Sequence, residues 1–423
     1  MRMTIDPRTI RRPTMIQPFR TRRRTFFASL AGLPGLHLLA SEGRAAPRED
    51  ARTPAAGRDV IGELGVRSFI NAAGTFTALT GSLMPPEVVS AIQVAARKYV
   101  RLEDLHNAVG ARIAELLGCE AALVTAGCAS ALSLATAACV AGDDPERIRR
   151  LPDTQGMKDE VLVQRTHRVG YDHAIRNAGV RMIEVETREE LERAISDRTA
   201  MMFFFNAADP RGQIHREEFI EIGKSHGIPT LLDAAADVPP VDNLWKYTKM
   251  GFDLVGFSGG KGLRGPQSSG LLLGRKDLIE AAKLNNSPNS DSLCRTNKVN
   301  KEEIVGMLVA LERYLQLDHD AIWKEWEGRC HRIIEALSEF DDVQTEIYVP
   351  EIANAVPHLR IRWDSEKRGI RPSEAVEKLR NGDPSIEPSP GSGRRDVVIG
   401  VWMMEPGDDA IVGDRLREIL AGA

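Results

Sequence analysis

The sequence predicts an α/β protein in which a three-layer large domain with a mainly parallel sheet precedes a smaller C-terminal α+β domain. From about residue 59 onward, short apolar segments alternate with helical patterns, which is the order that a parallel sheet requires. Several of these segments are continuously apolar, as is typical of strands covered on both faces. The 423 residues, 42% of them hydrophobic, are enough for a large core and a second domain.

Two helices are expected first. Pro85-Pro86 begins a helix that runs to about Tyr99, because a first helical turn tolerates proline. Apolar residues at helical spacing predict the second helix over Leu102–Leu117, and Gly118 ends it. Seven strand-like segments follow, separated by helical patterns: Ala121–Thr125, Glu160–Val163, Val180–Val185, Ala200–Phe205, Ile228–Leu232, Leu254–Phe257 and Gly270–Leu273.

The last third of the chain has a different pattern. A helical connection is expected around residues 300–340, followed by strands at His358–Trp363 and Asp396–Trp402 and a closing helix at Asp408–Leu420. We therefore expect a large domain with an N-terminal arm over residues 59–300. Connecting helices and the small domain would occupy residues 301–423.

The N-terminal segment is predicted to be an export signal. Residues 1–46 hold nine arginines against Asp6 and Glu42, so they carry +7 of a formal net charge of −4, and the remainder carries −11. Arg22-Arg23-Arg24-Thr25-Phe26-Phe27 resembles the twin-arginine motif, and a broken apolar run and small residues follow it. We expect a signal over 1–46, a linker over 47–58 and a periplasmic protein. The alternative is a cytoplasmic protein with a basic extension.

Cysteine usage and charge exclude several classes of protein. The five cysteines form no CxxC pair, so we expect no disulfide framework and no metal site. Cys119 and Cys139 stand in apolar surroundings and are expected to be buried. The acidic remainder has no run of Lys and Arg, which argues against a nucleic-acid partner.

The loop Ser258–Pro266 contains the strongest chemical signal, a lysine among glycines between two apolar strands. It is not a phosphate-binding P-loop, because Val255 and Gly262 break that pattern and a strand follows instead of a helix. Small neighbours around Lys261 are typical of a Schiff-base lysine, since they let a flat cofactor approach the backbone. Taken alone, Lys261 would be a solvated loop residue.

Two further features favour pyridoxal 5′-phosphate as the cofactor. The apolar strand Ile228–Leu232 ends in Asp233, where a carboxylate would reach the crevice at the strand ends and keep a pyridine nitrogen protonated. Its alternative role is a helix cap or a local ion pair. Residues 126–130 are small and stand between a strand and an apolar helix, so their N–H groups would bind phosphate.

The phosphate turn, the aspartate and the lysine follow one another along the chain in the order typical of the fold-type I pyridoxal-phosphate enzymes, which the chain resembles. It is most similar to the class V aminotransferase-like branch that includes selenocysteine synthase and D-glucosaminate-6-phosphate ammonia-lyase. The most specific stretches are INAAGTFTALTGSLMPP (70–86), LPDTQGMKDEVLVQRTHRVGYDHAIRNA (151–178) and SGGKGLRGPQSSGLLLGRKDLI (258–279). The resemblance implies an aldimine at Lys261, Asp233 at the pyridine nitrogen and His167 stacked on the cofactor ring. It implies phosphate contacts from Gly127, Cys128, Ala129, Ser258 and Arg264.

Two departures from the branch are visible. Ala236 stands where cysteine desulfurase-like members carry a glutamine, so contact to the ring hydroxyl must come from elsewhere. Cys128 is expected to be a packing residue. Selenocysteine synthesis needs a surface for a large tRNA, which an acidic chain with an export signal lacks, so we do not expect that activity.

The resemblance implies a carbon–nitrogen lyase that releases ammonia from a β-hydroxy amino acid or an amino sugar acid. An aminotransferase or racemase of the class V type is the alternative, and a non-catalytic cofactor-binding protein is a further one. Arg168 and Tyr171 are candidate substrate contacts. Arg360, which alternates with apolar residues on its strand, is another candidate. For each of them an exposed surface position is the alternative.

Enzymes of this fold usually place the active site at a dimer interface. We therefore expect a homodimer or a higher assembly. The expected partners are a small amino substrate and the export machinery, without another membrane partner.

Overall fold

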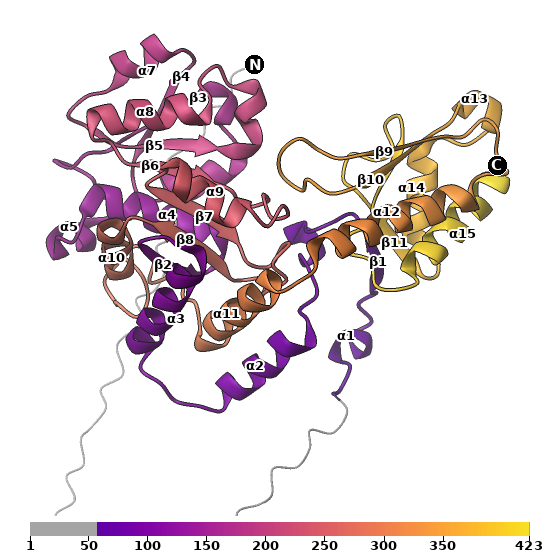
Figure 1. Ribbon diagram of the computed structural model, residues 1–423, viewed down its shortest axis with the longest axis horizontal. Coiled ribbons are helices and arrows are strands. Elements are labelled where there is room, and N and C mark those ends of the chain that lie inside the picture. Colours follow the sequence, from indigo (N-terminus) through magenta and orange to yellow (C-terminus); the bar gives the residue numbers. More distant parts are fainter. Residues whose placement is uncertain (1–56, 423) are drawn as a thin grey trace, which may run out of the picture. The chain divides into compact units, whose positions relative to one another are not determined.

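The computed structural model describes residues 57–422 (Figure 1). The predicted signal segment and residues 47–56 of the predicted linker lie outside the described residues. Within residues 57–422, no helix combines the length and the apolar character that crossing a membrane requires. All five cysteines are free thiols; Cys128, Cys294 and Cys330 are buried.

A seven-stranded sheet forms the larger part of the fold, as predicted. Its spatial order is β2-β8-β7-β6-β5-β3-β4, and β8 alone runs antiparallel to its two neighbours. The strands are β2 (Ala121–Thr125), β3 (Glu160–Gln164), β4 (Arg181–Val185), β5 (Thr199–Phe205), β6 (Thr230–Asp233), β7 (Leu254–Ser258) and β8 (Gly270–Gly274).

Both faces of this sheet are covered, which makes the three layers. Alternate residues of one strand enter two different apolar clusters: Leu232 packs in the first and Leu231 in the second. Helices α3, α8, α9 and α11 contribute to the first cluster, and α4 and α10 contribute to the second. The helices of this part are α2 (Pro86–Ala96), α3 (Leu102–Leu117), α4 (Gly127–Ala141), α5 (Pro145–Arg150), α6 (His173–Arg176), α7 (Arg188–Ala194), α8 (Arg216–His226), α9 (Asn243–Met250), α10 (Lys276–Leu284) and α11 (Lys301–Leu315). The short helix α1 (Val60–Glu63) precedes β1 and buries no residue.

The C-terminal part is the predicted smaller α+β domain. An antiparallel sheet in the order β12-β10-β9 packs with its helices in a third apolar cluster. A parallel pair, β1 with β11, ties the N-terminal end of the described chain to this cluster through Ile70 and Ala72. The elements are β1 (Phe69–Ala72), α12 (His319–Ala336), β9 (Gln344–Tyr348), β10 (His358–Arg362), α13 (Ser365–Arg368), α14 (Pro372–Asn381), β11 (Ser385–Pro388), β12 (Val397–Gly400) and α15 (Asp408–Ala421).

Several predicted boundaries were wrong by a few residues. The helix that begins at Pro86 ends at Ala96 rather than near Tyr99, whose side chain is fully exposed and has no apolar surface to cover. Strand β6 begins at Thr230 rather than at Ile228, and it ends at Asp233 as predicted. Cys119 and Cys139 are half-buried rather than buried, since both stand at the ends of helical segments.

The parallel strands bring several side chains to one edge of the sheet. Thr125, Phe205, Asp233 and Ser258 are each the last residue of their strand. Because β2, β5, β6 and β7 run in the same direction, these residues mark the carboxyl edge, where ligands bind in open α/β sheets.

Candidate active site

A cavity of about 450 Å³ lies at this carboxyl edge. It brings together the three features that sequence analysis singled out, namely Lys261, Asp233 and the turn at Gly127–Ala129. Lys261 is the one basic side chain among the described residues that line the cavity, and Asp233 and Asp237 are its two carboxyl groups. The volume is sufficient for a small cofactor with part of a substrate.

Backbone hydrogen bonds fix the loop that carries Lys261. The amide of Gly259 donates to the carbonyl of Ser269 at 2.8 Å, and the amide of Arg264 donates to the carbonyl of Lys261 at 3.0 Å. The glycines on either side of Lys261 allow close approach, because a Cβ on Gly260 would lie 2.3 Å from Cα of Gln267. The loop therefore holds the lysine backbone in one place at the cavity.

Asp233 is buried at the end of β6, and the hydrogen bonds to its carboxylate fall on one oxygen. Its Oδ1 accepts a hydrogen bond from the amide of Ala235 at 3.0 Å and one from the Cys128 thiol at 3.6 Å. Burial raises the pKa of Asp233, while the Ala235 amide and the charge of Lys261 oppose that rise. Burial and the charge of Asp233 raise the pKa of the Cys128 thiol well above its usual range, so the thiol stays protonated and acts as the donor.

The first residues of α4 form the phosphate-binding end of the cavity. Gly127 has φ +75°, and a Cβ built on it would meet no atom within 4 Å, so the turn opens onto free space. Behind the turn the packing is tight, because a Cβ on Gly270 would lie 2.5 Å from the carbonyl carbon of Gly127. A helix of 15 residues directs its partial positive charge and free amides to this point.

Sequence reasoning missed Asp237, a second buried carboxyl in the cavity. Its Oδ2 accepts hydrogen bonds from Nδ2 of Asn206 at 2.6 Å and from the hydroxyl of Tyr247 at 3.1 Å. Burial, with a contribution from the charge of Asp233, raises the pKa of Asp237 to about 6. Its position four residues after Asp233 was a signal that could have identified it.

Two distant segments complete the cavity walls and were also missed. Thr75, Phe76 and Thr77 come from the segment after β1, and Asn354 comes from the loop between β9 and β10. The amide of Asn354 donates to the carbonyl of Ala236 at 2.7 Å, which fixes this loop beside Asp233. Residues 70–86 are among the stretches that carry the resemblance, but the sequence alone assigns no role to any residue in them.

Four predicted site residues are not brought to the cavity, and two others are. Tyr171 and Ser258 line it. His167 is fully buried beneath β5, where its Nδ1 accepts the Phe205 amide at 3.2 Å, and burial lowers its pKa to about 4. His167 therefore does not line the cavity, and the expected stacking of its ring on the cofactor is not supported. The other three lie elsewhere because of their own contacts: Arg168 pairs with Asp172 and Glu184, Arg360 pairs with Glu346 and Asp396, and Arg264 lines a different cavity.

The described residues fit pyridoxal 5′-phosphate. The amine of Lys261, the buried carboxylate of Asp233 and the open turn at Gly127 supply the covalent anchor, the ring-nitrogen partner and the phosphate site that this cofactor needs. The described residues give Oδ2 of Asp233 no hydrogen bond, so this oxygen is available to a ring nitrogen. Among residues 57–422, no cluster of three or more His, Cys, Asp or Glu is placed to hold a metal ion.

Comparison with known proteins agrees with this fit. The model of the L-seryl-tRNA selenium transferase family, SelA, matches residues 69–323. D-glucosaminate-6-phosphate ammonia lyase of Salmonella typhimurium is 29% identical over 377 residues, covering 85% of this chain and 98% of that protein. The 5′-C-glycyluridine monooxygenase-decarboxylase of a Streptomyces species is 30% identical over 377 residues, covering 84% and 91%.

The fold comparison leads to the same group. A solved structure of D-glucosaminate-6-phosphate ammonia-lyase superposes with a TM-score of 0.76 at 28% identity, over 86% of this chain and 99% of that one. The resemblance to fold-type I enzymes that the sequence motifs indicated is thereby confirmed. Since the family model matches more than half of the residues, the chain belongs to the L-seryl-tRNA selenium transferase (SelA) family.

Proposed function

We propose that this protein is a pyridoxal-phosphate-dependent carbon–nitrogen lyase that releases ammonia from a β-hydroxy amino acid or an amino sugar acid. The observation that carries the proposal is that Lys261, Asp233 and the start of α4 line one cavity. The similarity to an ammonia lyase over 98% of that protein's length supports the reaction class.

Each residue has a defined task in this proposal. When bound, the cofactor withdraws electrons from the Cα of an attached amino substrate. Lys261 holds the cofactor and, once its amine is free, carries the Cα proton at Nζ. Asp233 keeps its negative charge next to the ring nitrogen, and the α4 amides bind the phosphate. Asp237, whose pKa is raised to about 6, is the cavity group suited to hold a proton for the departing hydroxyl.

The test of the cofactor is direct. The purified wild-type protein should be yellow and contain pyridoxal phosphate by mass spectrometry, and Lys261→Ala should lose the absorbance of the bound cofactor. Lys276→Ala, an exposed lysine at the start of α10, is the matched control and should keep it. A colourless wild-type protein without pyridoxal phosphate would refute the proposal.

The reaction class is tested by a substrate screen. Hydroxy amino acids and amino sugar acids are incubated with the holoenzyme, and keto acid and ammonia are measured without an added keto acid. Product that forms only with an added keto-acid acceptor would indicate an aminotransferase. Release of CO₂ under air would instead favour a decarboxylase, the second candidate, which the 30% identical monooxygenase-decarboxylase supports.

We also propose that the protein is exported through its twin-arginine segment, on the evidence of the residues Arg22–Phe27. Replacing Arg23-Arg24 by two lysines should retain the protein in the cytoplasm. The same replacement at Arg11-Arg12 is the control and should leave export unchanged. Equal export of both variants would contradict this proposal.

A homodimer is the assembly we propose. Large apolar side chains are exposed on the segment before α3, among them Leu83, Tyr99 and Val100, and Phe76 is exposed at the cavity itself. A second copy would cover this surface. Analytical ultracentrifugation of the holoenzyme should give twice the chain mass, and a monomer at micromolar concentration would contradict it.

A further inference from the structure

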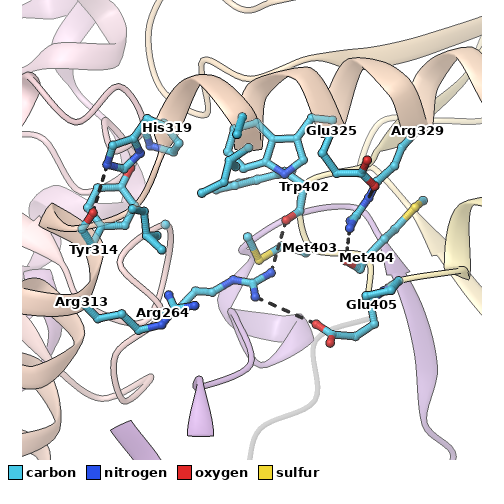
Figure 2. A pocket seen from close by; sticks show the side chains of 17 residues that line it. Arg264, Arg313, Tyr314, His319, Glu325, Arg329, Trp402, Met403, Met404 and Glu405 are labelled. Carbon is cyan, nitrogen blue, oxygen red and sulfur yellow. Dashed lines mark hydrogen bonds and ion pairs between the residues drawn. The ribbon is translucent and has the colours of Figure 1, made fainter. Parts of the chain in front are cut away.

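A second cavity, of about 490 Å³, lies against the loop that carries Lys261 and shares no lining residue with the first cavity. Lys261 lines the first cavity, whereas the next residue, Gly262, lines the second. Figure 2 shows Arg264 extending into the second cavity toward Trp402 and Glu405, with Arg313 beside it. Neighbouring residues of one short loop therefore line the two cavities.

Arginines dominate the charge of the second cavity. Arg264, Arg313 and Arg329 line it, against the carboxylates of Glu325 and Glu405. Arg329 has a structural task, because its Nη1 donates to the carbonyl of Met404 at 2.5 Å and its Nε pairs with Glu325 at 3.1 Å. Of the other two, Arg264 faces the half-exposed carboxylate of Glu405, and Arg313 lies beside Arg264 (Figure 2).

Arg264 is poorly supplied with partners for a guanidinium with five N–H donors. Within residues 57–422 its side chain makes one long hydrogen bond, 3.4 Å to the carbonyl of Trp402, and its Nη1 lies 4.0 Å from Glu405. In the same part of the chain, the one ion pair of Arg313 is with the exposed Glu87, at 3.5 Å. Burial and the nearby charges of Arg313 and Arg329 lower the pKa of Arg264, so a negative charge between these groups would be stabilised.

The backbone of Arg264 is also unusual. Its φ is +55°, the left-handed region that a glycine occupies without cost. A side chain with a Cβ costs about 1 kcal/mol or more in this conformation. The chain thus carries a strained residue where its guanidinium reaches the second cavity, which is typical of a functional position.

We propose that the second cavity is an anion site in which Arg264 and Arg313 bind a small molecule with two acidic oxygens, a phosphate monoester or a dicarboxylate. The indole of Trp326 and the side chain of Met403 supply apolar walls for the rest of that molecule. The volume is that of a small-ligand site. This inference does not depend on which reaction occurs at Lys261.

The site has a consequence for the first cavity. Arg264 is three residues from Lys261, and its amide donates to the carbonyl of Lys261. An anion held between Arg264 and Arg313 ties this loop to α11, so ligand binding restrains the loop that carries the lysine.

The experiment is isothermal titration calorimetry of the full-length holoenzyme with inorganic phosphate and, separately, with malonate at low ionic strength. Arg264→Gln keeps a polar side chain but removes the charge and the guanidinium, and it should weaken binding about tenfold or more, since charge-assisted hydrogen bonds are lost. Arg149→Gln, an exposed arginine on α5, makes the same change in net charge and should leave binding unchanged.

A third variant separates the site from a folding defect. Glu405→Gln removes the carboxylate that competes for Arg264, so it should bind the anion more tightly than the wild type, which a damaged protein would not do. Binding of phosphate alone assigns a phosphate ligand, and binding of malonate alone assigns a dicarboxylate. Undetectable binding of both anions, or equal binding by all variants, would overturn the proposal.

Discussion

The thiol of Cys128 lies 3.6 Å from Oδ1 of Asp233, the oxygen that also accepts the Ala235 amide. Two donors on Oδ1 leave Oδ2 as the oxygen directed to a bound ring. Cys128 belongs to the phosphate turn and Asp233 to β6, so one side chain links the two ends of the cofactor site. The cysteine that sequence analysis treated as a packing residue is therefore also a hydrogen-bond donor.

This contact predicts the effect of Cys128→Ala. Removing the thiol donor raises the pKa of Asp233 further, which weakens its interaction with a protonated ring nitrogen. We expect the affinity of the apoprotein for pyridoxal phosphate to fall about threefold, the size of one weak hydrogen bond. Equilibrium dialysis measures it. Cys139→Ala on the same helix should bind like the wild type, and equal affinities for all three proteins would contradict the role of Cys128.

A second prediction concerns the space that Cys128 occupies. A Cβ on Gly256 would lie 3.0 Å from Sγ of Cys128 and at ordinary contact distance from its other neighbours. Gly256→Ala should therefore lower the free energy of unfolding by about 1–3 kcal/mol in urea. In the Cys128→Ala background the same substitution should cost much less, because the sulfur is gone. Additive effects in this double-mutant cycle would show that the crowding lies elsewhere.

Sequence patterns predicted those site residues whose position is set by the end of a single strand. Lys261, Asp233 and Gly127 each follow or end a buried strand, and parallel strands bring such residues to a common edge without knowledge of distant contacts. His167 and Arg264 also follow strands, but local turns direct them away. His167 folds back in a 3-10 turn beneath β5, and the positive φ of Arg264 sends its side chain to the other cavity.

The remaining walls depend on long-range contacts that have no local signal. Phe76 reaches the cavity because β1 pairs with β11, more than 300 residues away along the chain. Asn354 reaches it through one hydrogen bond to Ala236. Neither the β1–β11 pair nor this hydrogen bond is marked in the sequence by a hydrophobic periodicity or a turn motif, so neither could be predicted.

Asp237 predicts a pH dependence of stability. Its pKa is about 6 in the fold and 3.8 ordinarily, so between these values the folded protein holds a proton that the unfolded chain has lost. Stability therefore falls as the pH rises through this window, and above pH 6 the ionised carboxylate costs of order 3 kcal/mol.

Asp237→Asn should remove that cost, because its amide oxygen still accepts from Asn206 and Tyr247 and carries no charge. In urea, the apoprotein variant should be more stable than the wild type at pH 8, and the advantage should shrink as the pH falls to 5. Asp242→Asn, an exposed aspartate nearby, should show no such trend. A gain that is equal at both pH values would contradict the assigned pKa.

The phosphate turn gives the last prediction. Gly270 lies on β8 directly behind the turn, and a Cβ there would be 2.5 Å from the carbonyl carbon of Gly127 and 2.7 Å from the amide of Cys128. Both are backbone atoms, so the turn itself must move in Gly270→Ala. Overpacking should lower the free energy of unfolding by about 1–3 kcal/mol. Because displaced amides bind phosphate poorly, the affinity for pyridoxal phosphate should also fall, roughly tenfold or more. Gly328→Ala is the control, because its Cβ would meet the ends of two flexible side chains, Arg332 at 3.2 Å and Glu325 at 3.9 Å, and alanine favours the helix α12. It should retain full affinity and lose no stability. If Gly270→Ala is destabilised but binds the cofactor as tightly as the wild type, this turn does not bind the phosphate.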